Sequence, residues 1–144
     1  MRVMDAMSVP AFTVTPGTGG REVARTMLDC GVSAFPVVDG DGAVLGVVSE
    51  ADVLSAHLTT TPPTAGDLMT SPAITVDPEA SLEEAAGLMH RYAVKRLPVV
   101  DRRGRVVGIV TRMDVLRALF EEADAMPPDV RRMVRARRRE TTPK

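Results

Sequence analysis

Short apolar runs alternate with polar turns in the first third of the chain. Residues 36–38 and 44–48 are almost wholly apolar, and the segment 39–42 between them reads Asp-Gly-Asp-Gly. Two short apolar runs joined by a glycine-containing polar turn predict a β-hairpin. The same succession returns around residues 98–110. The pattern therefore predicts two hairpins, one in each half of the chain.

A segment with helical spacing precedes each hairpin. Its apolar residues are Val23, Ala24, Met27 and Leu28 in the first half, and Leu82, Ala85, Ala86 and Met89 in the second. Apolar residues at these intervals predict an amphipathic helix. We expect Gly31 to end the first of these helices, because glycine tolerates the positive φ of a helix C-cap. After the first hairpin, Ser49 opens another predicted helix, which contains Val53 and Leu54.

The two halves are copies of one unit. Shifted by 62 residues, the sequence aligns on itself without a gap, and 23 of the 54 residues from position 4 to position 57 are identical. Each copy predicts an α/β unit of the order β-α-β-β-α. A unit of roughly 55 residues buries little apolar surface alone. We therefore expect the two copies to pack face to face with pseudo-two-fold symmetry.

The chain divides into four predicted segments. Residues 1–58 and 67–124 are the two repeats, residues 59–66 are a linker rich in Thr and Pro, and residues 125–144 are a basic tail. Proline in the linker prevents a helix from continuing through it. The tail has six Arg between positions 131 and 139. It predicts either contact with nucleic acid, acidic lipid or an acidic partner, or a terminal helix that is solvated or packs on the second copy of a dimer.

Composition excludes several classes of protein. The single cysteine, Cys30, excludes an internal disulfide, and without companion ligands it argues against a zinc site. No apolar run reaches membrane-spanning length and no signal-peptide pattern is present, so we expect a cytoplasmic protein with no membrane partner. Formal charge is −4 over residues 1–66, −2 over 67–128 and +5 over 129–144, so nucleic-acid binding by the body is not expected. No catalytic constellation is found, and we expect no enzyme.

Each copy also contains two characteristic strings. In the first copy they are 31–39 (Gly-Val-Ser-Ala-Phe-Pro-Val-Val-Asp) and 46–52 (Gly-Val-Val-Ser-Glu-Ala-Asp). In the second they are 93–101 (Ala-Val-Lys-Arg-Leu-Pro-Val-Val-Asp) and 108–114 (Gly-Ile-Val-Thr-Arg-Met-Asp). These strings resemble the two signatures of CBS domains, and four of them at one constant offset are specific. The resemblance extends from residue 4 to about residue 122, and it implies the fold of a Bateman module, a packed pair of CBS repeats.

The second string also has a chemistry of its own. It leads from a strand into a helix N-terminus with Ser49 or Thr111 at the cap, and Asp52 or Asp114 lies one turn further on. Free backbone N–H groups and the positive end of the helix dipole favour a phosphate there, and the carboxylate can accept the hydroxyls of a ribose. The alternative interpretation is structural, with the hydroxyl as helix cap and the acid as a favourable residue of the first turn.

By resemblance, each of two adenosine clefts combines both copies. The implied residues of cleft A are Val32, Ser33, Thr111, Arg112 and Asp114, and those of cleft B are Val94, Lys95, Arg96, Ser49 and Asp52. The segments 7–9 and 69–71 are expected on the far side of the adenine. No metal ligand is implied.

The two clefts differ in charge. Arg112 belongs to cleft A, whereas Glu50 stands beside the cap residue of cleft B and is partly offset by Lys95 and Arg96. A carboxylate near a phosphate costs up to about 1 kcal/mol at a solvated separation of ~4 Å, so we predict unequal affinities for phosphorylated ligands. Ala93 replaces the glycine expected in the first string, and because alanine disfavours positive φ we expect a slightly different backbone there.

The expected function is regulatory. AMP, ADP or ATP would bind in the clefts as the regulatory ligand and change the shape of a homodimer, which signals to an unidentified effector protein; no bound cofactor is required. Two alternatives remain open. One is S-adenosylmethionine or another adenosyl ligand without phosphates, and the other is a structural or interaction module whose clefts stay empty.

Overall fold

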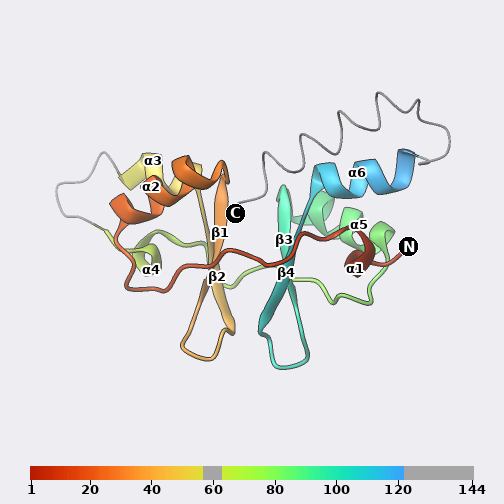
Figure 1. The fold of residues 1–144 in the computed structure, drawn as a ribbon, viewed down its shortest axis with the longest axis horizontal. Coiled ribbons are helices and arrows are strands. Elements are labelled where there is room, and N and C mark those ends of the chain that lie inside the picture. Colours follow the sequence, from red (N-terminus) through yellow and green to blue (C-terminus); the bar gives the residue numbers. More distant parts are fainter. Residues whose placement is uncertain (57–62, 122–144) are drawn as a thin grey trace.

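Two repeats lie side by side in the computed structural model, which describes residues 1–56 and 63–121 (Figure 1). The elements of the first half are α1 (Val3–Ala6), α2 (Gly20–Cys30), β1 (Ala34–Val38), β2 (Val44–Ser49) and α3 (Glu50–Ala56). Those of the second half are α4 (Ala65–Leu68), α5 (Leu82–Tyr92), β3 (Arg96–Val100), β4 (Val106–Thr111) and α6 (Arg112–Phe120). The predicted hairpins and the helices that flank them are confirmed. The predicted tail 125–144 and the first half of the predicted linker lie outside the described residues.

A short helix precedes the predicted unit in each repeat. The first strand of that unit is a single parallel bridge, Val14 to Val37 in repeat 1 and Val76 to Val99 in repeat 2. The added helices are α1 and α4, and α4 begins at Ala65, inside the segment predicted as linker. Along their other edge, β1 and β3 pair with β2 and β4.

A capping box explains why α4 forms where a linker was expected. The Thr64 hydroxyl accepts the Asp67 N–H at 3.3 Å, and Asp67 Oδ2 accepts the Thr64 N–H at 3.0 Å. These reciprocal bonds satisfy two of the free N–H groups at a helix start. Hydrogen bonds from Thr64 hold the pKa of Asp67 below its ordinary value, and the bond from the backbone N–H has a larger effect than the bond from the hydroxyl.

The two hairpins are joined at their tips. In each, the strands are antiparallel and the register is irregular at the same point. The Val44 N–H donates to the carbonyl of Gly104 at 3.0 Å, and the Val106 N–H donates to the carbonyl of Gly42 at 3.0 Å. These reciprocal bonds connect equivalent positions of the two repeats, as pseudo-two-fold symmetry requires.

The helices before both hairpins end in the left-handed conformation. Gly31 has φ 65° and ψ 32°, as predicted, and its N–H donates to the carbonyl of Met27. Ala93 has φ 53° and ψ 43°, so the expectation of a different backbone at this alanine is wrong. The Ala93 N–H donates to the carbonyls of Met89 and His90. These bonds and the start of β3 dictate the backbone, and Ala93 accepts a conformation that costs an L residue roughly 1–2 kcal/mol.

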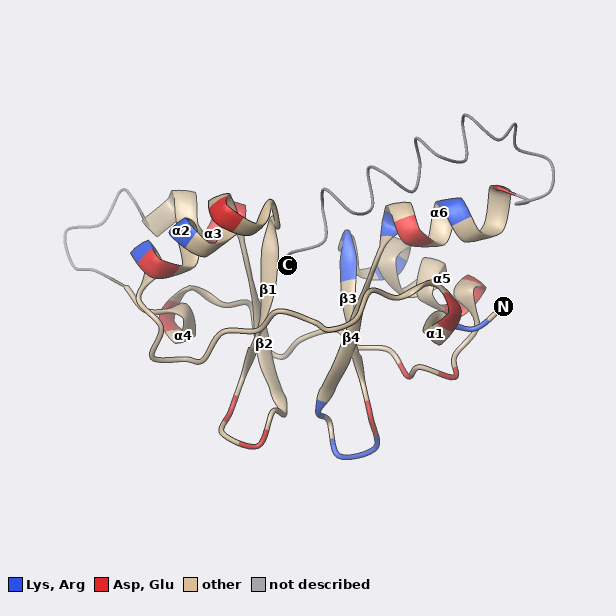
Figure 2. Ribbon diagram, in the orientation of Figure 1, with Lys and Arg blue, Asp and Glu red and all other residues tan. Residues whose placement is uncertain are grey.

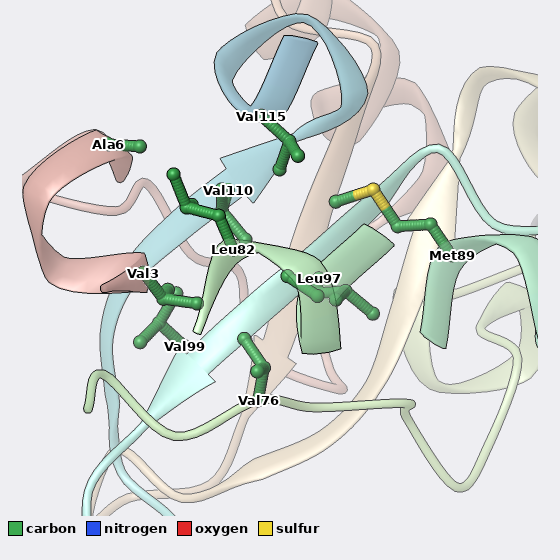
Figure 3. Close-up of a cluster of buried hydrophobic side chains, with 10 residues drawn as sticks. Val3, Ala6, Val76, Leu82, Met89, Leu97, Val99, Val110 and Val115 are labelled. Carbon is green, nitrogen blue, oxygen red and sulfur yellow. The ribbon is translucent and has the colours of Figure 1, made fainter. Parts of the chain in front are cut away.

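Helix α1 packs in the core of repeat 2, not in that of its own repeat. Its buried side chains Val3 and Ala6 lie against the second hairpin and α5 (Figure 3). The other buried residues of this core are Val76, Leu82, Ala85, Met89, Leu97, Val99, Val110 and Val115. The backbone fixes the placement, because the Val3 N–H donates to the carbonyl of Ala80 at 2.8 Å.

Helix α4 makes the reciprocal exchange. Its buried Ala65 belongs to the core of repeat 1, with Val14, Val23, Met27, Phe35, Val37 and Val48. The Ala65 N–H donates to the carbonyl of Thr18 at 2.7 Å, and the Gly20 N–H donates to the carbonyl of Pro63 at 2.8 Å. Each core is therefore completed by a segment from the other half of the sequence. No helix among the described residues is long and apolar enough to cross a membrane.

Candidate functional site

A cavity of about 490 Å³ lies at the position predicted for cleft A, between the two repeats. Four of the five residues predicted for this cleft line it: Val32, Ser33, Thr111 and Asp114. Val32 and Ser33 stand just before β1, and Thr111 ends β4 directly before α6. The structure thus brings together two strings that are 78 residues apart between Ser33 and Thr111.

The N-terminal segment forms another wall of cleft A. Met7 and Ser8 line the cavity, as predicted, and so does Phe12. Ser8 pairs with Ile109 of β4, since the Ser8 N–H donates to the Ile109 carbonyl at 2.8 Å and the Ile109 N–H donates back at 3.1 Å. The exchange of α1 into the core of repeat 2 places this segment here. It gives the cleft apolar surface suitable for the face of an adenine ring.

Asp114 is the buried carboxylate of cleft A. Its residue is only 8% exposed. Its Oδ2 accepts the Thr111 N–H at 2.9 Å, and its own N–H donates to the Thr111 hydroxyl at 3.1 Å, which closes a capping box at the start of α6. Asp114 therefore has the helix-capping role considered in the sequence analysis, and this role uses Oδ2. The other oxygen, Oδ1, lies 3.6 Å from Nη1 of Arg117. A ribose hydroxyl at Oδ1 would compete with Arg117 for it.

Two cations line cleft A that the sequence did not assign to it. Arg117 lies one turn after Asp114 on α6. Arg96, predicted for cleft B, reaches across from β3 and donates from Nη2 to the Ser33 hydroxyl at 2.8 Å. The pKa of Arg96 is lowered, mainly by burial. The nearby charge of Glu50 raises this pKa, and that of Arg112 lowers it further. The guanidinium remains charged, since an arginine does not lose its proton in proteins.

Arg112 is not among the residues that line cleft A. It lines a second cavity of about 480 Å³, a groove between α5 and α6 that also includes Val94 and Lys95. The Arg112 N–H donates to the Lys95 carbonyl at 2.9 Å, which places both residues at the same end of repeat 2. Helical geometry explains the difference, because successive residues of a helix point about 100° apart. Arg117, three residues after Asp114, faces the cleft instead.

The residues predicted for cleft B do not line one cavity. Val94 and Lys95 line the α5–α6 groove and Arg96 lines cleft A, whereas Ser49 and Asp52 line neither cavity. The two repeats differ at the position before the buried strand, where Ala34 stands in repeat 1 and Arg96 in repeat 2. Arg96 and Ala34 both line cleft A, where Arg96 contacts Ser33.

Ser49 and Asp52 nevertheless form the same local structure as their equivalents. Asp52 Oδ2 accepts the Ser49 N–H at 2.7 Å and the Ser49 hydroxyl at 3.0 Å. Both strings therefore build a capped helix start, and the one in repeat 2 lines cleft A. In the part of the chain that the structure describes, no three His, Cys, Asp or Glu side chains gather as metal ligands would.

Arg117 and Phe12 line cleft A and were not among the residues predicted for it. Arg117 had a usable signal, since an Arg three residues after an Asp on a predicted helix faces the same side. Phe12 had none, because it lies in an irregular segment whose position depends on the exchange of α1.

A model of the CBS domain matches the chain twice, over residues 3–59 and 65–121. Among known proteins, the inosine-5'-monophosphate dehydrogenase of Korarchaeum cryptofilum is 39% identical over 104 residues. The match covers 72% of this chain but 21% of that enzyme, so this chain spans about a fifth of its length. CBSX1 of Arabidopsis thaliana, a chloroplastic CBS domain-containing protein, is 29% identical over 138 residues; the match covers 75% of this chain and 58% of that protein.

Solved structures of CBS pairs have the same fold. CBSX2 in complex with AMP superposes with a TM-score of 0.77 at 32% identity, over 83% of this chain and 96% of that chain. The CBS domain pair of protein MJ0100, in complex with 5'-methylthioadenosine and S-adenosyl-L-methionine, superposes with a TM-score of 0.77 at 29% identity, over 83% and 95%. The predicted fold, two α/β repeats packed as a Bateman module, is confirmed, and the chain belongs to the CBS-domain family as a tandem pair.

Proposed function

We propose that this CBS pair is a non-catalytic regulatory module that senses an adenosyl ligand in cleft A. The observation that supports it most strongly is the buried carboxylate of Asp114, which faces a cavity of about 490 Å³ between the repeats. A buried acid beside an open cavity suits the two hydroxyls of a ribose. The solved relatives with the same fold bind AMP in one case, and 5'-methylthioadenosine and S-adenosyl-L-methionine in the other.

Each wall of cleft A has a role in this proposal. Asp114 holds the ribose, and the backbone around Val32 reads the adenine edge while Met7 and Phe12 cover its face. Arg96 is the cation placed for a 5'-phosphate, since its guanidinium is already held in position by Ser33. Charged hydrogen bonds of this kind contribute more than neutral ones. We therefore favour AMP or another adenine nucleotide over an adenosyl ligand without phosphate.

Titration calorimetry with AMP, ADP, ATP and S-adenosylmethionine tests the proposal. Asp114→Ala should lower affinity at least tenfold, whereas Asp52→Ala, the matched control, breaks the equivalent capping box and should leave cleft A intact. The control is needed because either change also weakens a helix start. Equal losses in both variants would contradict the assignment to cleft A. No binding of any ligand by the wild-type protein would favour the interaction module.

Arg96→Met separates the two ligand classes. Loss of a charged hydrogen bond costs about 1.5–3 kcal/mol, so AMP should bind roughly 10- to 100-fold more weakly. 5'-Methylthioadenosine has neither a phosphate nor a carboxylate, so its affinity should not change. An AMP affinity that Arg96→Met leaves unchanged would contradict the assignment of Arg96 to the phosphate and favour the phosphate-free ligand.

A sensor of this kind also needs an assembly that responds. We propose a homodimer that presents an altered surface to a separate effector protein when the ligand binds. Large apolar side chains on the helices support self-association, since Leu28 is 83% exposed, Leu54 70% and Phe120 77%. Monomeric proteins seldom expose apolar surface in contiguous patches. Ligand binding changes the assembly only if its affinity differs between two states of the dimer.

A further inference from the structure

Arg117 lies between two carboxylates on one side of α6. Its Nη1 is 3.6 Å from Oδ1 of Asp114, and its Nε is 4.0 Å from Oε2 of Glu121. Residues three or four positions apart share one face of a helix. Figure 2 shows red and blue segments alternating along α6. Arg117 thus contacts two acids, of which Asp114 lines cleft A and Glu121 is exposed.

The two ion pairs of Arg117 differ in their exposure to water. The side chain of Asp114 is 11% exposed and that of Arg117 is 23% exposed, whereas that of Glu121 is 37% exposed. Removing the partner of a buried charge costs more free energy than removing the partner of an exposed one. Asp114 therefore depends on a compensating partner at Oδ1, and Arg117 is that partner when no ligand is bound.

A ribose in cleft A needs the same oxygen of Asp114. Because Oδ2 already accepts the Thr111 N–H at 2.9 Å, we expect a ribose hydroxyl to donate to Oδ1. A hydrogen bond to a charged carboxylate is a strong one, so the hydroxyl can replace the compensation that Arg117 gives. Arg117 then loses its contact with Asp114, and Glu121 is the acid already within reach of its Nε.

The position equivalent to Arg117 in repeat 1 holds a serine. With the offset of 62 residues, Asp52 corresponds to Asp114 and Ser55 corresponds to Arg117. The Ser55 hydroxyl donates to the Ala51 carbonyl at 3.0 Å, within α3 itself. The helix start is capped in both repeats, so the cap does not require a cation one turn later. The position of Arg117 beside cleft A therefore explains this residue better than the fold of the repeat does.

We infer that Arg117 competes with the ribose of the ligand for Asp114, and that ligand binding moves Arg117 from Asp114 to Glu121. The inference rests on the proposed adenosyl site and adds a residue that sets its affinity. Each ligand that binds displaces Arg117, so the ion pair raises the concentration at which cleft A fills. Glu121 lowers that concentration, because it stabilises the displaced guanidinium. Glu121 is thereby coupled to the ligand through Arg117, and coupling between two sites is reciprocal.

Titration calorimetry with AMP and its dideoxy analogue tests the competition. The two nucleotides have the same charge, and only AMP has the ribose hydroxyls that compete with Arg117. Arg117→Met should raise the ratio of the AMP affinity to the analogue affinity roughly 2- to 5-fold, the range expected for one ion pair of this kind. The loss of positive charge affects both nucleotides and cancels in the ratio. An unchanged or lower ratio would overturn the inference.

Two further variants separate competition from a structural role of Arg117. Arg112→Met makes the same change on the same helix, at a residue that lines the α5–α6 groove, and should leave the ratio unchanged. Arg117→Lys keeps the charge and should return the ratio close to the wild-type value. If Arg117 only stabilised α6, Arg117→Met would weaken the binding of both nucleotides to the same extent. A rise as large in Arg112→Met would contradict the competition.

A double-mutant cycle tests the transfer to Glu121. Glu121→Gln should lower the same ratio roughly 2- to 3-fold, because the displaced Arg117 loses its second acid. Added to Arg117→Met, the change should have no effect, since the coupling passes through Arg117. Equal effects of Glu121→Gln with and without Arg117 would overturn the transfer.

The inference and the proposed function fail in different ways. No AMP binding by the wild-type protein would overturn the proposed function together with this inference. AMP binding by the wild-type protein, with an unchanged ratio in Arg117→Met, would overturn this inference alone and leave the adenosyl site standing.

Discussion

The two repeats share the same backbone fold but differ in their surface side chains. Their strands pair in the same register, and their capped helix starts use Ser49 with Asp52 in one and Thr111 with Asp114 in the other. Side chains at the ends of the elements differ, since Ala34 in repeat 1 corresponds to Arg96 in repeat 2. The hairpin residues Pro36, Val37 and Val38 recur as Pro98, Val99 and Val100. On the exposed helix surfaces, Asp29 and Glu50 correspond to Arg91 and Arg112, at positions that core packing does not dictate.

The largest difference that we expect in stability concerns the equivalent core residues Phe35 and Leu97. Both are fully buried, one in each core. Phe35→Ala should lower the free energy of unfolding by about 4 kcal/mol and Leu97→Ala by about 3 kcal/mol, since cost rises with the volume removed. Denaturant unfolding of both variants measures this. If each variant unfolds in two separate steps, the exchange of α1 and α4 does not make the two cores cooperative.

Glycines on the central strands should show the next largest effects. A Cβ at Gly46 would lie 2.6 Å from the backbone oxygen of Thr70, whereas at Gly108 the nearest atom is the flexible Met7 sulfur at 2.8 Å. Overpacking costs about 1–3 kcal/mol, so Gly46→Ala should be near the upper end and Gly108→Ala near the lower. Thermal unfolding compares them. Equal costs would mean that the backbone around Thr70 yields as easily as a methionine side chain.

The left-handed helix ends provide a smaller and opposite pair of changes. Gly31→Ala should destabilise the protein by about 1 kcal/mol, and Ala93→Gly should stabilise it by about the same amount. Both residues have positive φ, and Gly31 has open space around its Cβ position. The melting temperatures should therefore move in opposite directions. A loss of stability in Ala93→Gly would show that the Ala93 side chain makes a contact worth more than its strain.

The smallest expected effect is a pH dependence at the start of α4. Because hydrogen bonds from Thr64 lower the pKa of Asp67, its contribution to the free energy of unfolding is present above the ordinary pKa of an unfolded Asp. That contribution is lost as pH falls through the lower pKa of the folded state. Asp67→Asn should be less stable than the wild type at neutral pH and equally stable in acid.

Asp5 is the matched control for this measurement, since it occupies the equivalent place in α1 and accepts the Arg2 N–H but has no hydroxyl partner at position 2. Asp5→Asn should therefore change stability less. A larger effect in Asp5→Asn would mean that the Thr64 hydroxyl is not the source of the difference.

Much of the site could be read from the sequence. Local patterns predicted both hairpins, the caps at Ser49 and Thr111, and the glycine that ends α2. The resemblance to CBS domains implied that Val32 and Ser33 lie together with Thr111 and Asp114, and all four line cleft A. Arg112, predicted for cleft A, lines the α5–α6 groove instead, because one residue along a helix turns a side chain by about 100°. Arg96 was predicted for cleft B but lines cleft A. Its position in the repeat does not show in which direction its long side chain extends.

By itself, the sequence determined the repeat, its elements and the chemistry available in each copy, since these depend on local spacing and on residue type. The tertiary structure decided which copy completes which core and which cavity opens. Val3 is buried with the second half and Ala65 with the first, an exchange that local patterns cannot show because each helix would satisfy the same pattern in either core. Cleft A is formed by this exchange, since it brings Met7 and Ser8 beside Asp114.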